Sequence, residues 1–315
     1  MPKVLICRRF PDSIMERVAT LFDIDVHDST EPMVQPERSA ALGRYDGIMA
    51  TLGDTFPAEV FSGGHRCKII ANFGVGYNHI DAAAAHEAGI QVTNTPGVLT
   101  DATADIAMTL MMMAARRAGE GERMVRADGW PGWHPTQLLG RDVTGATLGI
   151  IGFGRIGQAM ARKAHYGFGM RIVYQNRSPK TADFPAQQLD SIEAVCAEAD
   201  FVAVHAPGAA ENKHLFGAQH FAAMKPTGIF INTARGDVVD EAALIDTLER
   251  RAIFGAGLDV YEFEPKVPAG LRALGNVVLL PHLGSASLPV REAMGNMALD
   301  NLEAFFKGAA VPNPV

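Results

Sequence analysis

Long hydrophobic runs are missing from the sequence. No uninterrupted apolar stretch approaches the roughly 18 residues that a helix needs to span a bilayer, and the apolar run 110–115 is followed directly by Arg116 and Arg117. The first ten residues, MPKVLICRRF, lack the long apolar region and the small-residue cleavage site of a secretory signal. We therefore expect a cytoplasmic protein without a membrane role.

Cysteine is also scarce, and the 28 lysines and arginines are outnumbered by 35 acidic residues. Cys7, Cys67 and Cys196 lie far apart, and none has a cysteine or histidine nearby at metal-ligand spacing. We expect reduced, buried thiols and no bound metal. The formal net charge of −7 gives no basic footprint, so we expect no role in binding nucleic acid or an anionic membrane.

Short apolar runs alternate with helix-length amphipathic stretches along the 315 residues. At roughly 100 to 200 residues per domain, this length predicts two domains. The alternation is typical of βα units that form a parallel sheet with helices on both faces. In the first part, strands are expected at 4–7, 47–50, 68–71 and 90–92, and helices at 12–21 and 82–88.

The second part begins with a helical pattern that runs from Asp101 through Val125 and breaks at 129–132. After it, strands are expected at 148–151, 171–174, 201–205, 228–232, 255–259 and 277–280. Six strands separated by helices make one complete dinucleotide-binding sheet. A last amphipathic helix is expected at 287–307.

A glycine pattern marks the start of this second sheet. The segment TLGIIGFGRIG places Gly152, Gly154 and Gly157 directly after an apolar strand and at the opening of a helix. One such glycine permits a tight turn, one lets a pyrophosphate approach the backbone, and one lets the helix pack on the strand. A lone G-x-G-x-x-G is weak evidence, but here the context matches on both sides. The turn is predicted to bind a dinucleotide.

The end of the next strand bears on which dinucleotide is used. An acid at this position would bind the 2′-hydroxyl of the adenosine ribose, but the strand ends in Gln175, Asn176, Arg177 and Ser178. With no acid to repel it, a 2′-phosphate could bind to the Arg177 cation and the Ser178 hydroxyl. We expect NADPH to be preferred and NADH to be usable. The alternative is that Arg177 is a solvated loop residue.

Residues suited to carbonyl reduction follow three of the expected strands: Arg235, Glu264 and His282. An arginine fork can grip a carboxylate, and a histidine oriented by a carboxylate can protonate a carbonyl oxygen. Ligands of open α/β sheets bind at the carboxyl ends of the strands. Taken singly, each residue could equally be a capping or surface residue.

Six motifs then carry a resemblance to a known family. They are NFGVGYNHID (72–81), NTPGVLTDATAD (94–105), GIIGFGRIGQAMA (149–161), INTARG (231–236), GLDVYEFEP (257–265) and PHLGSAS (281–287). In this order and spacing the sequence resembles the D-isomer-specific 2-hydroxyacid dehydrogenases, in particular their glyoxylate/hydroxypyruvate reductase branch. The resemblance implies two Rossmann-like, doubly wound α/β domains with parallel sheets. The dinucleotide-binding domain (100–284) would be inserted into the substrate, or catalytic, domain (1–99 and 285–315).

The resemblance also implies roles for individual residues. Arg235 would be the substrate clamp, His282 the proton donor in reduction, and Glu264 the partner that orients His282. Backbone amides of Val75 and Gly76 would bind the substrate carboxylate, and Asp259 would hold the nicotinamide carboxamide. The residues expected along the cofactor are Thr103, Gly152, Gly154, Arg155, Ile156, Gly157, Asn176, Arg177, Ser178, His205, Ala206, Pro207, Thr233, Ala234, Asp259, His282 and Gly284.

The expected function is reduction of a small 2-keto acid, glyoxylate or hydroxypyruvate, to the D-2-hydroxy acid, with 2-ketogluconate as a further candidate. Formate dehydrogenases pair the histidine with glutamine, where this chain has Glu264. Phosphoglycerate dehydrogenase remains an alternative, although those enzymes commonly have an acid where this chain has Asn176 and a regulatory domain beyond the point where this sequence ends. A non-catalytic, dinucleotide-sensing corepressor of the same fold is the other alternative.

Three features outside these roles receive structural interpretations. The apolar helical segment 105–115 predicts a homodimer. Asn78, His79 and Asp81 are expected to form a turn and a helix cap. Whether Trp130 or Trp133 touches the substrate stays open.

Overall fold

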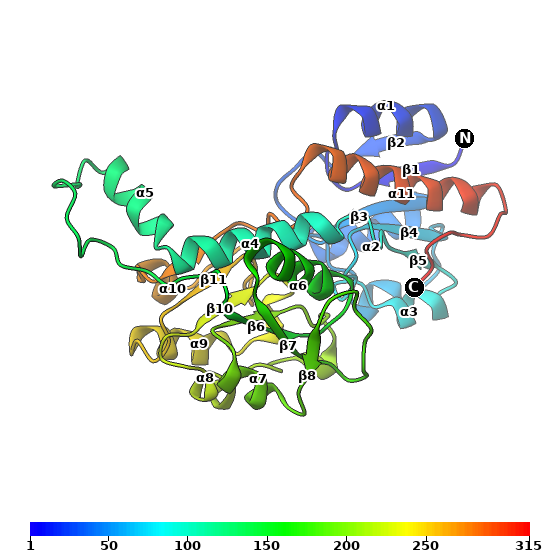
Figure 1. Ribbon diagram of the computed structural model, residues 1–315. Coiled ribbons are helices and arrows are strands. Elements are labelled where there is room, and N and C mark those ends of the chain that lie inside the picture. The colour runs from blue at the N-terminus through cyan, green and yellow to red at the C-terminus, as the bar shows by residue number, and fades with distance from the viewer. The chain divides into compact units, whose positions relative to one another are not determined.

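The computed structural model describes all 315 residues, and the chain divides into two compact units (Figure 1). Unit 1 comprises Met1–Leu99 and Ala286–Val315, and unit 2 comprises Thr100–Ser285. Each unit contains its own parallel sheet, so the expected α/β fold class is confirmed. None of the helices combines the length and the apolarity needed to cross a lipid bilayer. All three cysteines are buried and unpaired.

Unit 1 is built on a five-stranded sheet in the order β2-β1-β3-β4-β5. Its strands are β1 (Lys3–Ile6), β2 (Asp23–Val26), β3 (Gly47–Thr51), β4 (Ile69–Phe73) and β5 (Gln91–Thr93), and all neighbours are parallel. Its helices are α1 (Asp12–Leu21), α2 (Gln35–Arg44), the short η1 (Ala58–Phe61), α3 (Ala82–Glu87) and α11 (Leu288–Phe306). Because the strands are parallel, the chain leaves all of them at the same edge of the sheet.

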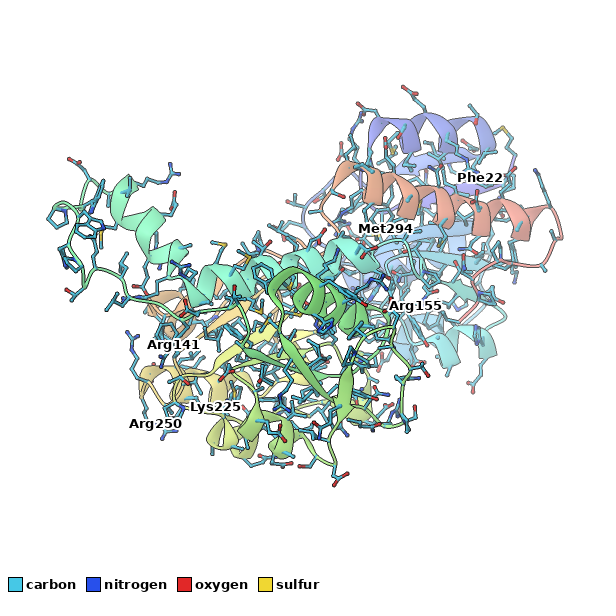
Figure 2. The ribbon with its side chains drawn as sticks, viewed as in Figure 1. Phe22, Arg141, Arg155, Lys225, Arg250 and Met294 are labelled. Atoms are coloured by element: carbon cyan, nitrogen blue, oxygen red, sulfur yellow. The ribbon has the colours of Figure 1, made fainter.

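The last helix, α11, packs against α1 and β4. Gly295 makes this close approach possible, because a Cβ there would lie 2.6 Å from Ile14 Cγ1. Near one end of the contact, the rings of Phe22 and Phe306 lie 5.7 Å apart. Figure 2 labels Phe22, which directly follows α1, and Met294, which lies in α11. The bounds expected from the sequence differ from those observed by one residue at each end.

Unit 2 is built on a seven-stranded sheet in the order β12-β11-β10-β9-β6-β7-β8. Its strands are β6 (Thr147–Ile151), β7 (Arg171–Gln175), β8 (Ala186–Gln188), β9 (Phe201–Val204), β10 (Ile229–Asn232), β11 (Gly255–Leu258) and β12 (Val277–Leu279). Its helices are α4 (Thr100–Ala115), α5 (Ala118–Arg126), α6 (Arg155–Phe168), α7 (Ile192–Glu198), α8 (Ala218–Ala223), α9 (Glu241–Glu249) and α10 (Ala269–Ala273), with short helices η2 (Ala210–Asn212) and η3 (Gly236–Val238).

Alternate residues of these strands enter two separate apolar cores. Ile150 and Ile231 pack with residues of α4 and α6 on one face, whereas Ile151 and Phe230 pack with residues of α7, α8 and α9 on the other. Both faces are therefore covered, which explains why the strands appear in the sequence as continuous apolar runs. The ends of the strands, rather than their faces, are left for a site.

The sequence analysis missed two strands, so the expected total of six in the second sheet is wrong. β2 (DIDV) and β8 (AQQ) both lie at sheet edges and are largely exposed or half-buried. An edge strand pairs on one side only and needs no continuous apolar run. Neither segment therefore shows the pattern on which the prediction depended.

The long helix expected from Asp101 through Val125 is also wrong, because α4 ends at Ala115 and α5 begins at Ala118. Arg117 between them has a left-handed backbone (φ 52°). The returning chain causes the break: Arg141 N donates to Ala115 O at 2.8 Å, and a Cβ on Gly140 would lie 2.3 Å from the same oxygen. A tertiary contact thus replaces the next helical hydrogen bond.

Candidate active site

The predicted phosphate-binding turn lies between β6 and α6. Gly152 has a left-handed backbone (φ 91°), and a Cβ there would lie 2.6 Å from Ala206 N at the end of β9. A Cβ on Gly157 would lie 2.5 Å from Gly152 O. Only glycine fits at either position without a shift of the backbone, so the turn stays tight and α6 packs directly on β6.

Gly154 differs from the other two glycines, because a Cβ there would meet no atom within 4 Å. It is the N-cap of α6, whose first N–H groups have no partner within the helix. Arg155 lies at this helix start (Figure 2), and Ile156 follows it. Open space beside a helix N-terminus suits a pyrophosphate, because the N–H groups and the helix dipole favour an anion. The residues present therefore fit a dinucleotide.

The carboxyl end of β10 gives a second indication of a ligand. Thr233 Oγ1 is buried there and has no hydrogen-bond partner in the protein. A buried hydroxyl without a partner costs free energy, and a group bound at this edge would provide one. At the end of β9, burial lowers the pKa of His205 to about 4, so its ring is neutral at physiological pH. Ala206 and Pro207 follow it in the chain.

The end of β7 holds the residues expected to select the cofactor. Asn176 Oδ1 accepts from Phe153 N at 3.1 Å, and Asn176 Nδ2 donates to Ser178 O at 2.8 Å. Asn176 thereby joins this strand end to the glycine turn. The side chain of Arg177 is 82% exposed, and its only close acid is Glu211 at 3.9 Å, so it can reach into solvent toward a phosphate.

Arg235 follows β10 and is partly buried. Its Nη1 donates to Ala234 O at 2.8 Å. Burial lowers the pKa of Arg235, while the carboxylates of Glu264 and Asp237 act against this shift, and an arginine remains cationic at any physiological pH. The site therefore offers a fixed cation in a poorly solvated place.

Two neighbours of Arg235, Asn232 and Gly236, shape its turn, and the sequence analysis did not single them out. Asn232 Nδ2 donates to Arg235 O at 3.0 Å, and Asn232 Oδ1 accepts from Ala234 N at 2.9 Å. A Cβ on Gly236 would lie 1.8 Å from Tyr261 C, so only glycine lets this turn press against the segment that leads to Glu264. A polar residue at a buried strand end was the available signal for Asn232.

Asp259, at the end of β11, organises the turn that carries His282. Its Oδ1 accepts from Leu283 N at 2.7 Å and its Oδ2 accepts from Gly284 N at 2.8 Å. Thr103 Oγ1 of α4 donates to Gly284 O at 3.1 Å. Burial raises the pKa of Asp259, and the backbone N–H groups and the charge of His282 oppose that shift. Thr103, Asp259, Leu283 and Gly284 thus form one hydrogen-bonded cluster.

His282 itself follows β12 in a left-handed conformation (φ 55°), which is uncommon for a residue other than glycine. Its N–H donates to Asp259 O at 2.9 Å. Its ring Nδ1 lies 2.8 Å from Glu264 Oε2, so Nε2 is the nitrogen available to a reactant. Backbone strain of this kind persists only where surrounding contacts hold it, and the Asp259 cluster supplies those contacts.

Glu264 is held from two sides. Its Oε1 accepts from Tyr261 N at 3.0 Å, and its Oε2 faces His282 Nδ1. Burial raises the pKa of Glu264, but the hydrogen bond and charge of His282, the Tyr261 N–H and the charge of Arg235 outweigh burial, and the net shift is below the ordinary value. Glu264 is therefore an ionised carboxylate that lies against the His282 ring.

In unit 1, the turn containing Val75 and Gly76 follows β4. Asn72 is fully buried and its Nδ2 donates to Gly74 O at 3.1 Å and to Gly76 O at 3.0 Å. His79 Nε2 lies 3.1 Å from Asn72 Oδ1. The sequence analysis placed His79 in a structural turn, and the structure shows what the histidine supports. Asp81 accepts from Ala84 N at 2.9 Å and caps α3.

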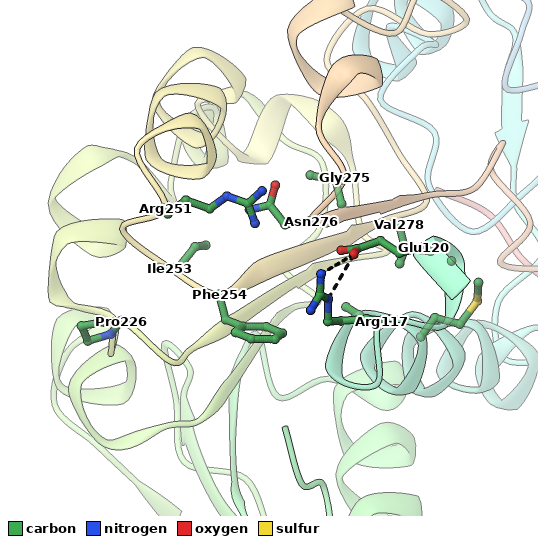
Figure 3. A pocket seen from close by; sticks show the side chains of 13 residues that line it. Arg117, Glu120, Pro226, Arg251, Ile253, Phe254, Gly275, Asn276 and Val278 are labelled. Atoms are coloured by element: carbon green, nitrogen blue, oxygen red, sulfur yellow. Dashed lines mark hydrogen bonds and ion pairs between the residues drawn. The ribbon is translucent and has the colours of Figure 1, made fainter. Parts of the chain in front are cut away.

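A separate hollow of about 250 Å³ opens on unit 2 and contains none of the predicted site residues (Figure 3). Arg117 and Glu120 form an ion pair of 2.6 Å on its wall, and Arg251 and Asn276 line another part. Its lining includes residues just before β11 and β12, at the amino ends of those strands. Ligands of such sheets bind at the carboxyl ends, so this hollow lies at the edge where no ligand of the sheet is expected.

Comparisons with known proteins show which proteins this chain resembles. Residues 108–284 match the sequence profile described as "D-isomer specific 2-hydroxyacid dehydrogenase, NAD binding domain". A glyoxylate reductase of Thermococcus litoralis is 42% identical over 100% of this chain and 96% of its own length. A crystal structure of a protein from Thermus thermophilus is 42% identical, with a TM-score of 0.92 and 99% of each chain covered.

A third relative is described with its cofactor. It is an NADPH-dependent glyoxylate/hydroxypyruvate reductase of Sinorhizobium meliloti, in complex with NADP and malonate. It is 34% identical, with a TM-score of 0.88, and the match covers 100% of this chain and 96% of that one.

Proposed function

Because this chain belongs to the D-isomer-specific 2-hydroxyacid dehydrogenase family, we propose that it reduces glyoxylate and hydroxypyruvate to the D-2-hydroxy acids with NADPH. It is an NAD(P)-dependent 2-hydroxyacid dehydrogenase and uses a nicotinamide dinucleotide. The observation that carries the proposal is the 2.8 Å pairing of His282 with Glu264, next to the Arg235 turn. The names of the curated relatives support glyoxylate as the substrate.

Each of the three proposed catalytic residues has a distinct task. Arg235 binds the carboxylate and the carbonyl oxygen of the keto acid and stabilises the charge that develops on that oxygen. His282 donates a proton to the same oxygen from Nε2, because its Nδ1 is occupied by Glu264. Glu264 keeps the ring in this orientation and stabilises its protonated form. When bound, the reduced dinucleotide supplies the hydride.

The substrate carboxylate is held by the backbone N–H groups of Val75 and Gly76. Asn72 supports this role, since its amide fixes the carbonyl groups of Gly74 and Gly76 and so leaves the N–H groups of the turn in a set orientation. The hydrogen bonds of a preorganised turn need no rearrangement when the substrate arrives.

A steady-state screen tests this function. Glyoxylate, hydroxypyruvate, pyruvate and 2-ketogluconate are each assayed with NADPH and with NADH. Glyoxylate or hydroxypyruvate should give the highest kcat/KM, with many turnovers per active site. A single turnover or none at saturating glyoxylate would favour the alternative, a dinucleotide-sensing corepressor of the same fold.

The preference for NADPH rests on the neutral and basic residues after β7. Arg177 and Ser178 bind the 2′-phosphate, and Asn176 replaces the acid that would repel it. The variant Arg177→Ala with Asn176→Asp removes the cation and adds a repelling charge, and should reverse the ratio of kcat/KM for the two cofactors. Asp retains the oxygen that accepts from Phe153 N, so the glycine turn stays supported. Equal wild-type efficiency with both cofactors would contradict the preference.

We also propose a homodimer, but on another surface than the segment 105–115 from which it was predicted. The apolar residues of that segment, such as Leu110 and Met111, are buried in the core of unit 2. The proposed surface is instead α5 and the segment that follows it. In Figure 1, α5 extends away from the rest of unit 2. Val125, Trp130, Trp133 and Leu139 are 62%, 54%, 78% and 61% exposed, an apolar surface that a second copy would cover. Light scattering during gel filtration should give twice the 33.7 kDa of one chain, and Val125→Glu should lower that mass. A wild-type monomer would refute the assembly.

A further inference from the structure

A hollow of about 320 Å³ in unit 1 has a lining rich in cations. Arg8, Arg9 and Arg291 line it, together with Leu52, Phe73 and three further residues, none of which is acidic. The acids that pair with two of these arginines lie outside the lining. Asp54, 3.2 Å from Arg8, is fully buried, and Asp12, 3.3 Å from Arg9, is exposed. The lining thus carries three cations and no acid, and the carboxylates that pair with Arg8 and Arg9 lie just outside it.

Two of the arginines are held in place by the protein. Arg8 pairs with Asp54 and also donates to the carbonyl oxygen of Cys7. Asp54 is fixed in turn, because it accepts from Thr51 Oγ1 at 3.2 Å. Arg291 of α11 lies over the ring of Phe73 at 5.7 Å from its centroid. Cations that are already ordered lose little entropy when they bind an anion.

The floor of the hollow is apolar. The rings of Phe10 and Phe73 lie 4.7 Å apart, and both side chains are buried. Arg291 is half-buried, and this burial lowers its pKa, so its guanidinium is less solvated than that of an exposed arginine. An anion gains more from cations beside such a floor than from the same cations in bulk water. The hollow thus combines room, charge and low solvation.

The hollow lies at the same edge of the sheet as the turn of Val75 and Gly76. Arg8 follows β1, Leu52 follows β3, and Phe73 is the last residue of β4. All these strands are parallel, so their carboxyl ends share one edge. The next residues after Phe73 form the turn of Val75 and Gly76, to which the proposed function assigns the substrate carboxylate. A substrate held at that turn has the hollow beside it.

We propose that this hollow binds a second anionic group, a carboxylate or phosphate at the far end of the substrate. The enzyme then also reduces 2-keto acids with a terminal anion, and its natural substrate is not restricted to the smallest members of the class. This inference rests on the proposed function for the position of the first carboxylate. It adds Arg9 and Arg291 as residues that determine specificity.

Matched pairs of keto acids test the inference. 2-Ketoglutarate and 2-ketovalerate have the same chain length and differ by a terminal carboxylate, and 3-phosphohydroxypyruvate and hydroxypyruvate differ by a terminal phosphate. In the wild type, the anionic member of at least one pair should have about tenfold higher kcat/KM, as expected of a hydrogen bond to a charged group. The pair that shows the effect identifies the anion. A ratio of one or less for both pairs overturns the inference.

The variants Arg9→Gln and Arg291→Gln should each lower that ratio about tenfold. The loss should be in KM rather than kcat, because the distal group is bound equally before and during the reaction. Arg291→Lys keeps the charge and should restore part of the ratio. Arg8 is left unchanged, since its removal would strand the buried Asp54. Arg44→Gln is the control: Arg44 is 65% exposed in unit 1, pairs with Asp25 and does not line the hollow. Its ratio should equal that of the wild type.

A binding measurement separates this inference from the proposed function. Succinate and butyrate are titrated by calorimetry into the protein saturated with NADP⁺, and succinate should bind more tightly, with the difference reduced in Arg9→Gln. If no keto acid is reduced but succinate shows this dependence, the function fails and the anion site stands. If glyoxylate is reduced but neither the ratios nor the binding depend on Arg9 or Arg291, the anion site fails and the function stands.

Discussion

Replacing Glu264 with glutamine removes the carboxylate charge that faces His282. The two side chains are joined by a 2.8 Å contact between Glu264 Oε2 and His282 Nδ1, and they are 25% and 24% exposed. Glutamine keeps the size and one oxygen, so the ring can stay in place while the charge is lost. Protonation of the imidazole then becomes less favourable at every pH.

The size of the effect follows from this contact. A hydrogen bond to a charged partner contributes about 1.5–3 kcal/mol, and about 1.4 kcal/mol corresponds to a tenfold change in rate. Because both side chains are partly solvated, the lower end of the range applies. Reduction needs a protonated imidazole, and the variant lacks the charge that stabilises it. The value of kcat/KM for glyoxylate should therefore fall about tenfold in Glu264→Gln, with a different dependence on pH.

The assay is kcat/KM for glyoxylate between pH 5.5 and 9 with saturating cofactor. Glu264 stays ionised over this range in the wild type, because its pKa lies below the ordinary value, so its own titration does not distort the profile. Glu262→Gln is the matched control: Glu262 lies on the same loop and pairs with another histidine, His214, at 3.0 Å. An unchanged kcat/KM in Glu264→Gln, or an equal fall in Glu262→Gln, would refute the coupling.

Three further predictions concern the rest of the site. His282→Ala and Arg235→Ala should each lower kcat by roughly 10²- to 10⁴-fold, with the melting temperature and NADPH binding little changed; near-normal kcat would remove the residue from the mechanism. Gly154→Ala should weaken NADPH binding in calorimetry while leaving the melting temperature unaltered, since its Cβ meets no protein atom; unchanged affinity would show that no phosphate lies there. Asn72→Leu should raise KM for glyoxylate more than it lowers kcat, because it releases two carbonyl groups of the substrate turn; an unchanged KM would show that the turn needs no such support.

Elements buried on both faces were predicted well from the sequence. The strands β6, β9 and β10 are short apolar runs bounded by glycine or polar residues, and their bounds differ from expectation by a residue or two. Burial forces these positions to be apolar whatever their neighbours are, so the signal is local. β2 and β8 lie at edges, where this requirement is relaxed, and they were missed.

The break between α4 and α5 could not be predicted for a related reason. The segment is amphipathic across the break, no proline marks it, and Gly119 and Gly121 lie just beyond it, inside α5. The break exists because Arg141 N, 26 positions later, binds Ala115 O. Contacts of this range depend on where the chain returns, which no local pattern records.

In the candidate site, too, some features could be predicted from local sequence and others depend on contacts between distant parts of the chain. Residues that follow strands could be selected from the sequence, since parallel strands bring their carboxyl ends to one edge, and the family motifs gave Arg235, Glu264 and His282 their expected roles. The sequence by itself thus determined the α/β fold, the glycine turn and the family. Only the tertiary structure decided that Asp259 fixes the turn of His282 and that Arg291 joins Arg8 at one hollow. Such pairs are far apart in the chain, and their meeting depends on the packing of whole strands and helices.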